Sequence, residues 1–386
     1  MEKLVLLHES FISPLFLDTI KKNNWPVFAE GKMKQELEKK EISVLTENEL
    51  KEKFSLNPII YFNAEDCLAF IKKFSKDEKL KENIAFFKDK YALKKEIKKE
   101  YPEFFIAELR KKDFDSFVVP KGRELIIKPL VGFHSVGIKR FSSQEEWNKI
   151  KKEILLECEK YSKVFDENVL SDKVFLVEDY IKGDELVCDA FFNSEGKPVI
   201  LGLYHHPFSD ENDFRDLVYY CSSDFVKENY SKIKGFLDLI ASKRFFKNFP
   251  IHMEVRIKNG KVYPIEVNPL RFGGFGLADL PFHAFGINSF ELFFEDKKPD
   301  WNKIFSKKDK NFYAFIVGQT PSNFNPEKET IKTDEYKKTF KKILNYVPID
   351  ASKYKFFSTT YAESNKLEDL TNYLNYDFNQ LRKTNK

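Results

Sequence analysis

The sequence has 386 residues, which is enough for two or three domains with a substantial core in at least one of them. Hydrophobic residues make up 42% and charged residues 33%, and no apolar run approaches the length of a membrane span, so we expect a soluble globular protein and no membrane partner. The formal net charge is +4, from 65 basic residues interspersed with 61 acidic ones, which disfavours nucleic-acid binding.

The cysteines and the N-terminal segment bear on the cellular compartment. The four cysteines are widely spaced and form no C-x-x-C pair, which argues against a zinc site or a disulfide framework. The segment after Met1 lacks the basic start and the small-residue cleavage site of a signal peptide. We therefore expect a protein of the reducing cytoplasm.

The first part of the chain, residues 1–78, alternates short apolar runs with helical patterns. Strands are predicted at 3–7, 25–28, 42–45 and 58–62, and helices at 15–20 and 64–74. This alternation predicts a small parallel α/β domain. No G-x-G-x-x-G follows the first strand, which disfavours a dinucleotide site there, and the charged stretch 75–79 is a predicted boundary.

A strand that carries a lysine near its end is followed by a loop with two glycines and a serine. An amphipathic helix contains Lys90 and ends before Pro102, and residues 124–129 then form a predicted strand that includes Lys128. The loop 132–137 leads into another strand, so it could close over phosphates while the lysine supplies the charge. The alternative is an ordinary lysine at a strand end.

Two acids flank a glycine turn further along the chain. After a helix predicted at 143–160, an apolar strand ends at Glu178, and a turn at Gly183 leads into a second strand that begins near Glu185. Glu178 and the backbone after it form a natural edge for an adenine, and Glu185 could accept hydrogen bonds from ribose hydroxyls. The alternative is two surface acids on a hairpin.

Candidate substrate-binding residues follow the next predicted strand, 199–204. His205 and His206 come directly after it, and Arg215 lies in a polar segment without strong periodicity, 209–220. An arginine can pair with a carboxylate through two hydrogen bonds, so these side chains are candidates for recognising a substrate carboxylate or amine. Structural roles for all three are the alternative.

A helix is predicted at 224–243, and a β-hairpin follows it. Two runs of alternating apolar and polar residues flank the turn signal Asn259-Gly260. The polar face of the hairpin carries Glu254, Glu266 and Asn268. Carboxylate and amide oxygens are the hard ligands that Mg²⁺ takes beside nucleotide phosphates, so this face is a candidate metal site. The alternative is a half-exposed hairpin with solvated acids.

The register of this hairpin decides whether its two glutamates share a face. A two-residue turn would pair position 254 with position 265 and would place Glu254 and Glu266 on opposite faces. We therefore predict a three-residue loop, 258–260, with Gly260 left-handed beside a bulge.

The C-terminal third gives weaker signals. We predict a helix at 277–285, a charged linker at 291–309, strands near 313–317 and 355–359, and a helix at 367–374. No internal repeat is evident. The pattern leaves the role of residues 305–386 open.

Read together and in order, Lys90, Lys128 with its small-residue loop, EDYIKGDE and HMEVRIKNGKVYPIEVNP resemble the ATP-grasp superfamily over about residues 79–295. The resemblance implies an α/β and α+β chain in which two α+β subdomains grip ATP, behind a small parallel α/β pre-ATP-grasp domain. The expected domains are residues 1–78, an ATP-grasp domain at 79–300 whose phosphate-loop lid spans about 122–177, and a C-terminal α/β extension at 301–386.

Carried over position by position, the resemblance assigns a role to each motif. The nucleotide-binding set is Lys90, Lys128, Ser135, Val136, Gly137, Glu178, Tyr180, Ile181 and Glu185. The set that would hold Mg²⁺ or Mn²⁺ is Glu254, Glu266 and Asn268. The catalytic set is Arg271 and Lys128, and the substrate candidates are His205, His206, Arg215, Gly273 and Gly274. Two features depart from the family pattern, because Leu270 separates Arg271 from the Asn-Pro pair and the phosphate loop is poor in glycine.

The chemistry that the resemblance implies is carboxylate activation. The γ-phosphoryl group of ATP would pass to a substrate carboxylate, and an amine would attack the acyl phosphate to form an amide or peptide bond, with release of ADP and phosphate. Two other hypotheses stay open, a kinase that phosphorylates a small-molecule acceptor and a nucleotide-binding protein without turnover. The sequence identifies neither the acid nor the amine, and it leaves open whether the chain forms a homodimer.

Overall fold

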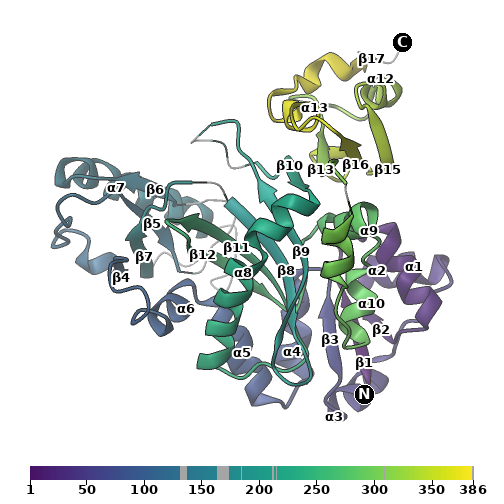
Figure 1. Cartoon of the computed structure of the whole chain (residues 1–386), viewed down its shortest axis with the longest axis horizontal. Coiled ribbons are helices and arrows are strands. Elements are labelled where there is room, and N and C mark those ends of the chain that lie inside the picture. The colour runs from purple at the N-terminus through teal and green to yellow at the C-terminus, as the bar shows by residue number, and fades with distance from the viewer. Residues whose placement is uncertain are drawn as a thin grey trace. The chain divides into compact units, whose positions relative to one another are not determined.

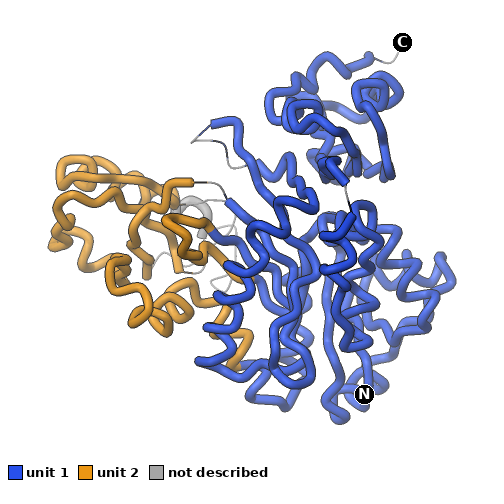
Figure 2. The backbone as a smooth tube through the Cα atoms, viewed as in Figure 1, with its two compact units in different colours: residues 1–81, 184–255, 268–386 blue, residues 82–183, 256–267 orange. Residues whose placement is uncertain are grey.

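The protein is described from a computed structural model. The structure describes residues 1–130, 137–183, 185–210, 213, 215–307 and 309–384, with the exception of residues 163–173 and of the side chains of 158–162. The chain divides into two compact units, shown in Figure 2. Unit 1 comprises residues 1–81, 184–255 and 268–386, and unit 2 comprises residues 82–183 and 256–267. The predicted domain boundaries at 78 and 300 stay predictions.

The N-terminal part of unit 1 is a three-stranded parallel sheet of order β2-β1-β3. Its strands are β1 (Lys3–Leu7), β2 (Val27–Ala29) and β3 (Ile59–Phe62), and its helices are α1 (Pro14–Asn23), α2 (Gly31–Lys39), α3 (Glu47–Ser55) and α4 (Leu68–Phe74). The small parallel α/β domain is thus confirmed. The predicted strand at 42–45 is wrong, because Val44 forms only an isolated bridge to Val27.

Unit 2 contains a four-stranded antiparallel sheet of order β4-β7-β5-β6. Its strands are β4 (Ile106–Arg110), β5 (Leu125–Pro129), β6 (Lys139–Phe141) and β7 (Val174–Asp179), and the helices of this region are α5 (Glu78–Lys88), α6 (Lys90–Glu96) and α7 (Gln144–Ser162). The core is apolar and centred on the fully buried Trp147, which packs against Phe114 and Phe141.

The largest sheet has eight strands in the order β12-β11-β8-β9-β10-β13-β16-β15. Its strands are β8 (Glu185–Phe192), β9 (Pro198–His206), β10 (Val218–Cys221), β11 (Phe249–Lys258), β12 (Lys261–Pro269), β13 (Phe312–Gln319), β15 (Lys342–Pro348) and β16 (Phe356–Ser364). The long helix α8 (Ser223–Lys243) precedes β11 (Figure 1). The two strands on either side of Gly183 are present, but the alternative of a hairpin between them is wrong, since β7 pairs with β4 and β5 whereas β8 pairs with β9.

The turn between β11 and β12 has two residues rather than three. Both Asn259 (φ 52°) and Gly260 (φ 76°) are left-handed, as a type I′ turn requires, and β12 begins directly afterwards at Lys261. Asparagine tolerates this conformation better than most residues, so no extra loop residue is needed. The predicted three-residue loop is therefore wrong, and the turn supplies no bulge. A shared face for Glu254 and Glu266 stays a prediction.

The remaining elements complete the C-terminal half. The helices are α9 (Leu280–Phe285), α10 (Ser289–Phe294), α11 (Trp301–Ser306), α12 (Thr333–Lys337) and α13 (Glu368–Thr371). The further strands are β14 (Glu329–Ile331) and β17 (Arg382–Thr384). The 3₁₀ helices in the described part of the chain are η1 (Glu65–Cys67), η2 (Lys111–Asp113), η3 (Leu277–Asp279), η4 (Asn372–Asn375) and η5 (Phe378–Leu381). The predicted linker at 291–309 is wrong, because Phe290 and Trp301 anchor α10 and α11 by burial. No helix in the described part of the chain has the length and apolarity needed to cross a bilayer.

Candidate active site

Two lysines share one buried glutamate in unit 2. The Nζ atom of Lys94 lies 2.7 Å from Oε2 of Glu178, and the Nζ atom of Lys128 lies 2.8 Å from Oε1. Side-chain exposure is 2% for Lys94 and 6% for Lys128 and Glu178. Both ammonium groups also donate to the carbonyl oxygen of Ile265, each at 3.4 Å. This cluster holds one more cation than anions.

Local structure explains how these three side chains meet. Lys128 on β5 lies opposite Leu176 on β7, so Glu178, two residues further along β7, is a diagonal neighbour on the same face. Lys94 comes from α6, whose first turn is fixed by the Asp89 carboxylate, which accepts from the backbone amides of residues 91 and 92. The predicted nucleotide-binding residues include Lys90 but not Lys94. Lys94 follows Lys90 by four residues, so both lie on one face of the helix, and this spacing could have pointed to Lys94.

The electrostatics of the cluster follow from burial and from the excess cation. Burial lowers the pKa of Lys94 to about 7, and the charge of Lys128 adds to that lowering, while Glu178 opposes it. Burial also acts against the charge of Lys128, but Glu178 and Glu266 outweigh it and raise the pKa of this lysine. Burial by itself would raise the pKa of Glu178, yet Lys128 and Lys94 together lower it. Glu178 is therefore an anion between two lysine side chains, of which Lys128 keeps its charge more firmly than Lys94.

Glu266 forms a second ion pair in the same unit. Its Oε2 lies 3.3 Å from Nζ of Lys90, with the lysine side chain 11% and the glutamate side chain 29% exposed. Burial acts to raise the pKa of Glu266, but Lys90, together with Lys88 and Lys128, lowers it. The carboxylate is thus ionised, as a metal ligand must be.

The predicted adenine-binding backbone follows β7 directly. The amide of Tyr180 donates to the carbonyl of Glu124 at 2.8 Å, and the carbonyl of Ile181 accepts from Nη1 of Arg256 at 2.8 Å. The guanidinium groups of Arg140 and Arg256 lie 4.6 and 5.3 Å from the centre of the Tyr180 ring. In the predicted phosphate loop, Gly137 has a left-handed φ of 71°, whereas Ser135 and Val136 lie outside the described residues.

In unit 1, the predicted ribose acceptor Glu185 is paired with His206. Their strands bring the two residues opposite each other, and Nδ1 of His206 lies 3.1 Å from Oε1 of Glu185. The imidazole stacks on the ring of Tyr219 with centroids 4.1 Å apart, and its Nε2 lies 3.6 Å from Asp216. His206 therefore fixes the Glu185 carboxylate, a partnership that sequence analysis did not foresee.

The other substrate candidates have different surroundings. The His205 ring packs against Tyr220 with centroids 4.8 Å apart. The Arg215 guanidinium forms a two-pronged ion pair with Asp213, at 2.7 and 2.9 Å, and also donates to the carbonyl of Leu374. This pairing is among the contacts that hold the pKa of the Asp213 carboxyl below its usual range, although burial acts in the opposite direction. Substrate recognition by these residues stays a prediction.

Arg271 follows a strained position. Leu270 is fully buried and has a φ of +59°, a conformation that a leucine rarely adopts. Its amide donates to the carbonyl of Pro250 at 2.7 Å and its own carbonyl accepts from the amide of Phe62 at 3.0 Å. Arg271 then donates to the carbonyl of Phe272 and lies 3.8 Å from Glu65. The extra residue before the arginine is thus accommodated by a left-handed leucine that is held from both sides.

The donor chemistry of the hairpin fits a hard cation. Glu254, Glu266 and Asn268 offer only oxygen atoms, and Asn268 is buried. Among the described residues, no group of three or more His, Cys, Asp and Glu side chains is placed to hold a metal by itself. The assignment of these three residues to a metal site stays a prediction.

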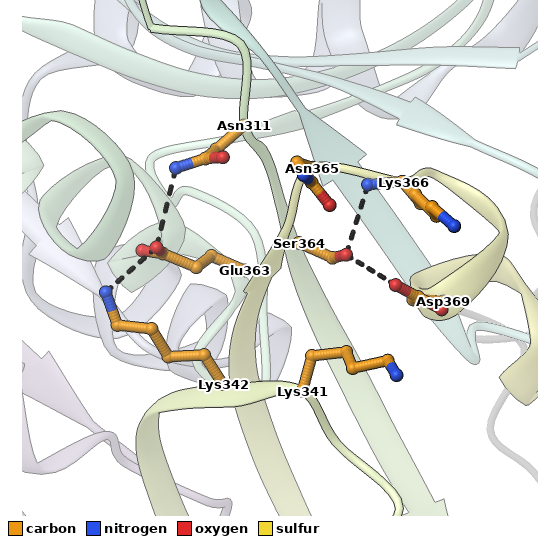
Figure 3. Close-up of a pocket in the computed structure, with 8 residues that line it drawn as sticks. All are labelled: Asn311, Lys341, Lys342, Glu363, Ser364, Asn365, Lys366 and Asp369. Atoms are coloured by element: carbon orange, nitrogen blue, oxygen red, sulfur yellow. Dashed lines mark hydrogen bonds and ion pairs between the residues drawn. The ribbon is translucent and has the colours of Figure 1, made fainter.

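A separate pocket lies in the C-terminal part of unit 1, with a volume of about 410 Å³. Figure 3 shows that Lys342 and Asn311 point toward Glu363, while Ser364 contacts Asp369. The pocket is lined by Asn311, Lys341, Lys342, Glu363, Ser364, Asn365, Lys366 and Asp369. It contains none of the residues that the sequence analysis assigned to a site.

Comparison with known proteins gives a family match for part of the chain and similar solved structures for its fold. Residues 122–279 match the family model described as the ATP-grasp domain. No curated protein matches the sequence. Three solved structures illustrate the fold. The L-amino acid ligase from Bacillus licheniformis has a TM-score of 0.66 at 14% identity, over 100% of this chain and 98% of that one.

The other two are similar over almost their full lengths. The N5-carboxyaminoimidazole ribonucleotide synthetase from Thermotoga maritima has a TM-score of 0.60 at 11% identity, over 100% of this chain and 99% of that one. The biotin carboxylase domain of 2-oxoglutarate carboxylase from Hydrogenobacter thermophilus has a TM-score of 0.61 at 13% identity, over 99% of this chain and 90% of that one. The predicted fold is confirmed, and residues 122–279 are the part of the chain that matches the ATP-grasp domain.

Proposed function

We propose that the protein is an ATP-dependent ligase that joins a carboxylate to an amine and releases ADP and phosphate. The observation that carries the proposal is the buried cluster of Lys94, Glu178 and Lys128, which holds an excess positive charge in unit 2. Two buried cations around one anion are stabilised by a further anion, and a nucleotide polyphosphate is the anion for which ATP-grasp enzymes provide lysines.

Metal binding is assigned to the hairpin acids. Glu254, Glu266 and Asn268 would hold Mg²⁺, and Lys90 lies 3.3 Å from the Glu266 carboxylate. A metal held there would neutralise part of the phosphate charge. The biotin carboxylase domain cited above was solved with the magnesium salt of ADP and with bicarbonate, which supports the same assignment here.

The remaining chemistry needs positioning and charge rather than a protein nucleophile. The substrate carboxylate attacks the γ-phosphorus, the bond to the β-phosphate oxygen breaks, and ADP leaves. Arg271 would stabilise charge on the transferred group, and the amine then displaces phosphate from the acyl phosphate. Burial raises the pKa values of the Cys67, Cys188 and Cys221 thiols, so none of these three described cysteines is poised as a thiolate nucleophile.

The substrate class follows from the chemistry and from one neighbour. One of the similar structures is an L-amino acid ligase, which suggests amino acids as both acid and amine. We therefore propose small-molecule amino acids as the first substrates to test.

The experiment is a screen for ADP release with Mg²⁺ and pairs of amino acids or related metabolites. A ligase releases ADP only when both a carboxylate and an amine are present. A phosphorylated product without an amine requirement would instead identify a kinase. ATP binding without hydrolysis across the whole panel would identify a binding protein.

Metal-ligand variants test the site itself. We expect Glu266→Gln to abolish ADP formation while the fold stays intact by circular dichroism, because the metal loses a charged ligand. Glu103→Gln is the matched control, since Glu103 is a solvent-exposed acid of the same unit that pairs with Lys261. Wild-type turnover in Glu266→Gln would contradict the metal assignment.

A further inference from the structure

Asp189 is a fully buried carboxylate that no part of the proposed chemistry uses. It lies in the middle of β8 with 0% exposure, and its two oxygen atoms accept three hydrogen bonds. Oδ2 accepts from the Tyr204 hydroxyl at 3.0 Å. Oδ1 accepts from the Gly273 amide at 2.8 Å and lies 2.7 Å from Nδ1 of His252. These donors come from β9, from the loop after β12 and from β11.

The pairing of β8 with β9 makes room for this carboxylate and its partner Tyr204. The β8–β9 register shifts between Asp189 and Ala190, which is a bulge of the kind that redirects side chains beside functional sites. Gly202 lies opposite Asp189, and a Cβ atom at position 202 would overlap the Tyr204 hydroxyl. The glycine thus leaves the space through which Tyr204 reaches the carboxylate. The register shift and the glycine thus leave the Asp189 carboxylate with hydrogen-bond partners on both oxygen atoms.

The first branch of the network leads to a predicted metal ligand. A carboxylate accepts but does not donate, so the His252 Nδ1 proton points at Asp189 and the opposite nitrogen, Nε2, faces the other way. That Nε2 lies 3.9 Å from Oε1 of Glu254, two residues further along β11 on the same face. The orientation of the imidazole beside Glu254 is therefore set by Asp189.

The second branch leads to the arginine loop. The Gly273 amide is bound by Asp189, and the amide of Phe272 next to it donates to the Tyr61 hydroxyl at 3.3 Å. Together with the strained Leu270, these bonds fix the backbone on both sides of Arg271. One carboxylate thus holds both the side chain beside Glu254 and the loop that presents Arg271.

We propose that Asp189 is a positioning residue for phosphoryl transfer, which acts through His252 on Glu254 and through the Gly273 amide on Arg271. The inference rests on the proposed function. In this proposal, the network Tyr204–Asp189–His252 aligns the metal and the transferred phosphoryl group. The lysine cluster of unit 2 plays no part in it.

The test compares Asp189→Ala with Asp189→Asn. Alanine leaves three buried donors without an acceptor, whereas asparagine keeps an acceptor oxygen in the same place. For Asp189→Ala we expect the Mg²⁺ concentration at half-maximal ADP formation to rise about 10-fold and kcat to fall about 10- to 100-fold, the range for partners that orient metal ligands. Asp189→Asn should recover most of both losses.

Binding and exchange measurements provide readouts that do not need turnover. The affinity of ATP without Mg²⁺, measured by calorimetry, should stay within about twofold of wild type in Asp189→Ala, because the loss of a residue that orients metal ligands weakens binding of the metal. Hydrogen exchange at the Gly273 amide should become about 10-fold faster or more, because its acceptor is gone. Unchanged exchange would overturn the loop branch even if the protein proved not to be a ligase.

Two further variants separate positioning from stability. Thr19→Val removes the hydrogen bond from the Thr19 hydroxyl to the Leu15 carbonyl and the one that this hydroxyl accepts from the Asn288 amide, and should lower stability without changing kcat or the Mg²⁺ dependence. His252→Ala should reproduce the shift in Mg²⁺ dependence. If Asp189→Ala lowered the melting temperature but kept wild-type kcat and Mg²⁺ dependence, the positioning role would be wrong while the proposed function would stand.

Discussion

At the scale of single residues, the shared carboxylate of Glu178 is the most consequential contact. We expect Glu178→Gln to lower the free energy of unfolding by about 3–5 kcal/mol, because the two buried lysine side chains lose the carboxylate that they share. Urea unfolding monitored by circular dichroism measures this. Lys94→Met is the comparison, since it leaves one balanced pair between Lys128 and Glu178, and a loss as large as that of Glu178→Gln would contradict the charge argument.

The lowered pKa of Lys94 makes stability depend on pH in a defined window. The folded-state pKa is about 7 and the usual lysine value is 10.5, so between these values the unfolded chain binds more protons than the folded one. Stability therefore rises with pH across this window, by at most about 1.4 kcal/mol per pH unit for one group. We expect wild type to gain stability relative to Lys94→Met from pH 7 to pH 9. A constant difference would show that Lys94 keeps an ordinary pKa.

The sequence supplied most of the candidate residues but not their partners. Lys128, Glu178, Glu185 and Glu266 were identified from motif order, and each proved to be paired with a group of opposite charge or with a histidine. Lys94 and Asp189 were missed because one is a lysine in a lysine-rich helix and the other an acid in an apolar run. The latter was a detectable signal, since an acid at a buried strand position needs partners.

At the scale of elements, the β11–β12 turn allows a test of backbone strain alone. Gly260 has a φ of +76° and open space around a Cβ atom, so we expect Gly260→Ala to destabilise the protein by about 1 kcal/mol through conformation only. Gly235 in α8 also has open space but lies within a helix, so Gly235→Ala should stabilise by about 0.5–1 kcal/mol. Thermal unfolding of both variants measures the signs, and a Gly260→Ala variant that is as stable as wild type or more stable would refute the assigned turn.

Whether a segment is a helix or a strand was predictable where the apolar residues recur at a clear period, whereas the pairing of strands into sheets was not. The strands on either side of Gly183 were found, but local sequence could not show that β7 and β8 join different sheets, because pairing partners come from distant segments. The hairpin loop was overpredicted by one residue, since the demand that Glu254 and Glu266 share a face was given priority over the ordinary preference of Asn-Gly for a two-residue turn.

At the scale of the whole molecule, the family motifs implied more of the fold than periodicity did. Motif order over residues 79–295 was sufficient to predict the ATP-grasp fold, which the structural comparisons confirm. The C-terminal segment carried no such motif. Its strands β13, β16 and β15 extend the eight-stranded sheet beyond β10, a long-range pairing that composition and local pattern do not encode.

The central claim is that a substrate carboxylate is activated by phosphoryl transfer, and isotope transfer tests it most directly. For the substrate pair that supports ADP release, the carboxylate is labelled with ¹⁸O, and the released inorganic phosphate is analysed by mass spectrometry. An acyl phosphate that is attacked by an amine leaves one labelled oxygen on the phosphate. We predict labelled phosphate in amounts equal to the ADP formed, whereas unlabelled phosphate would contradict the ligase account.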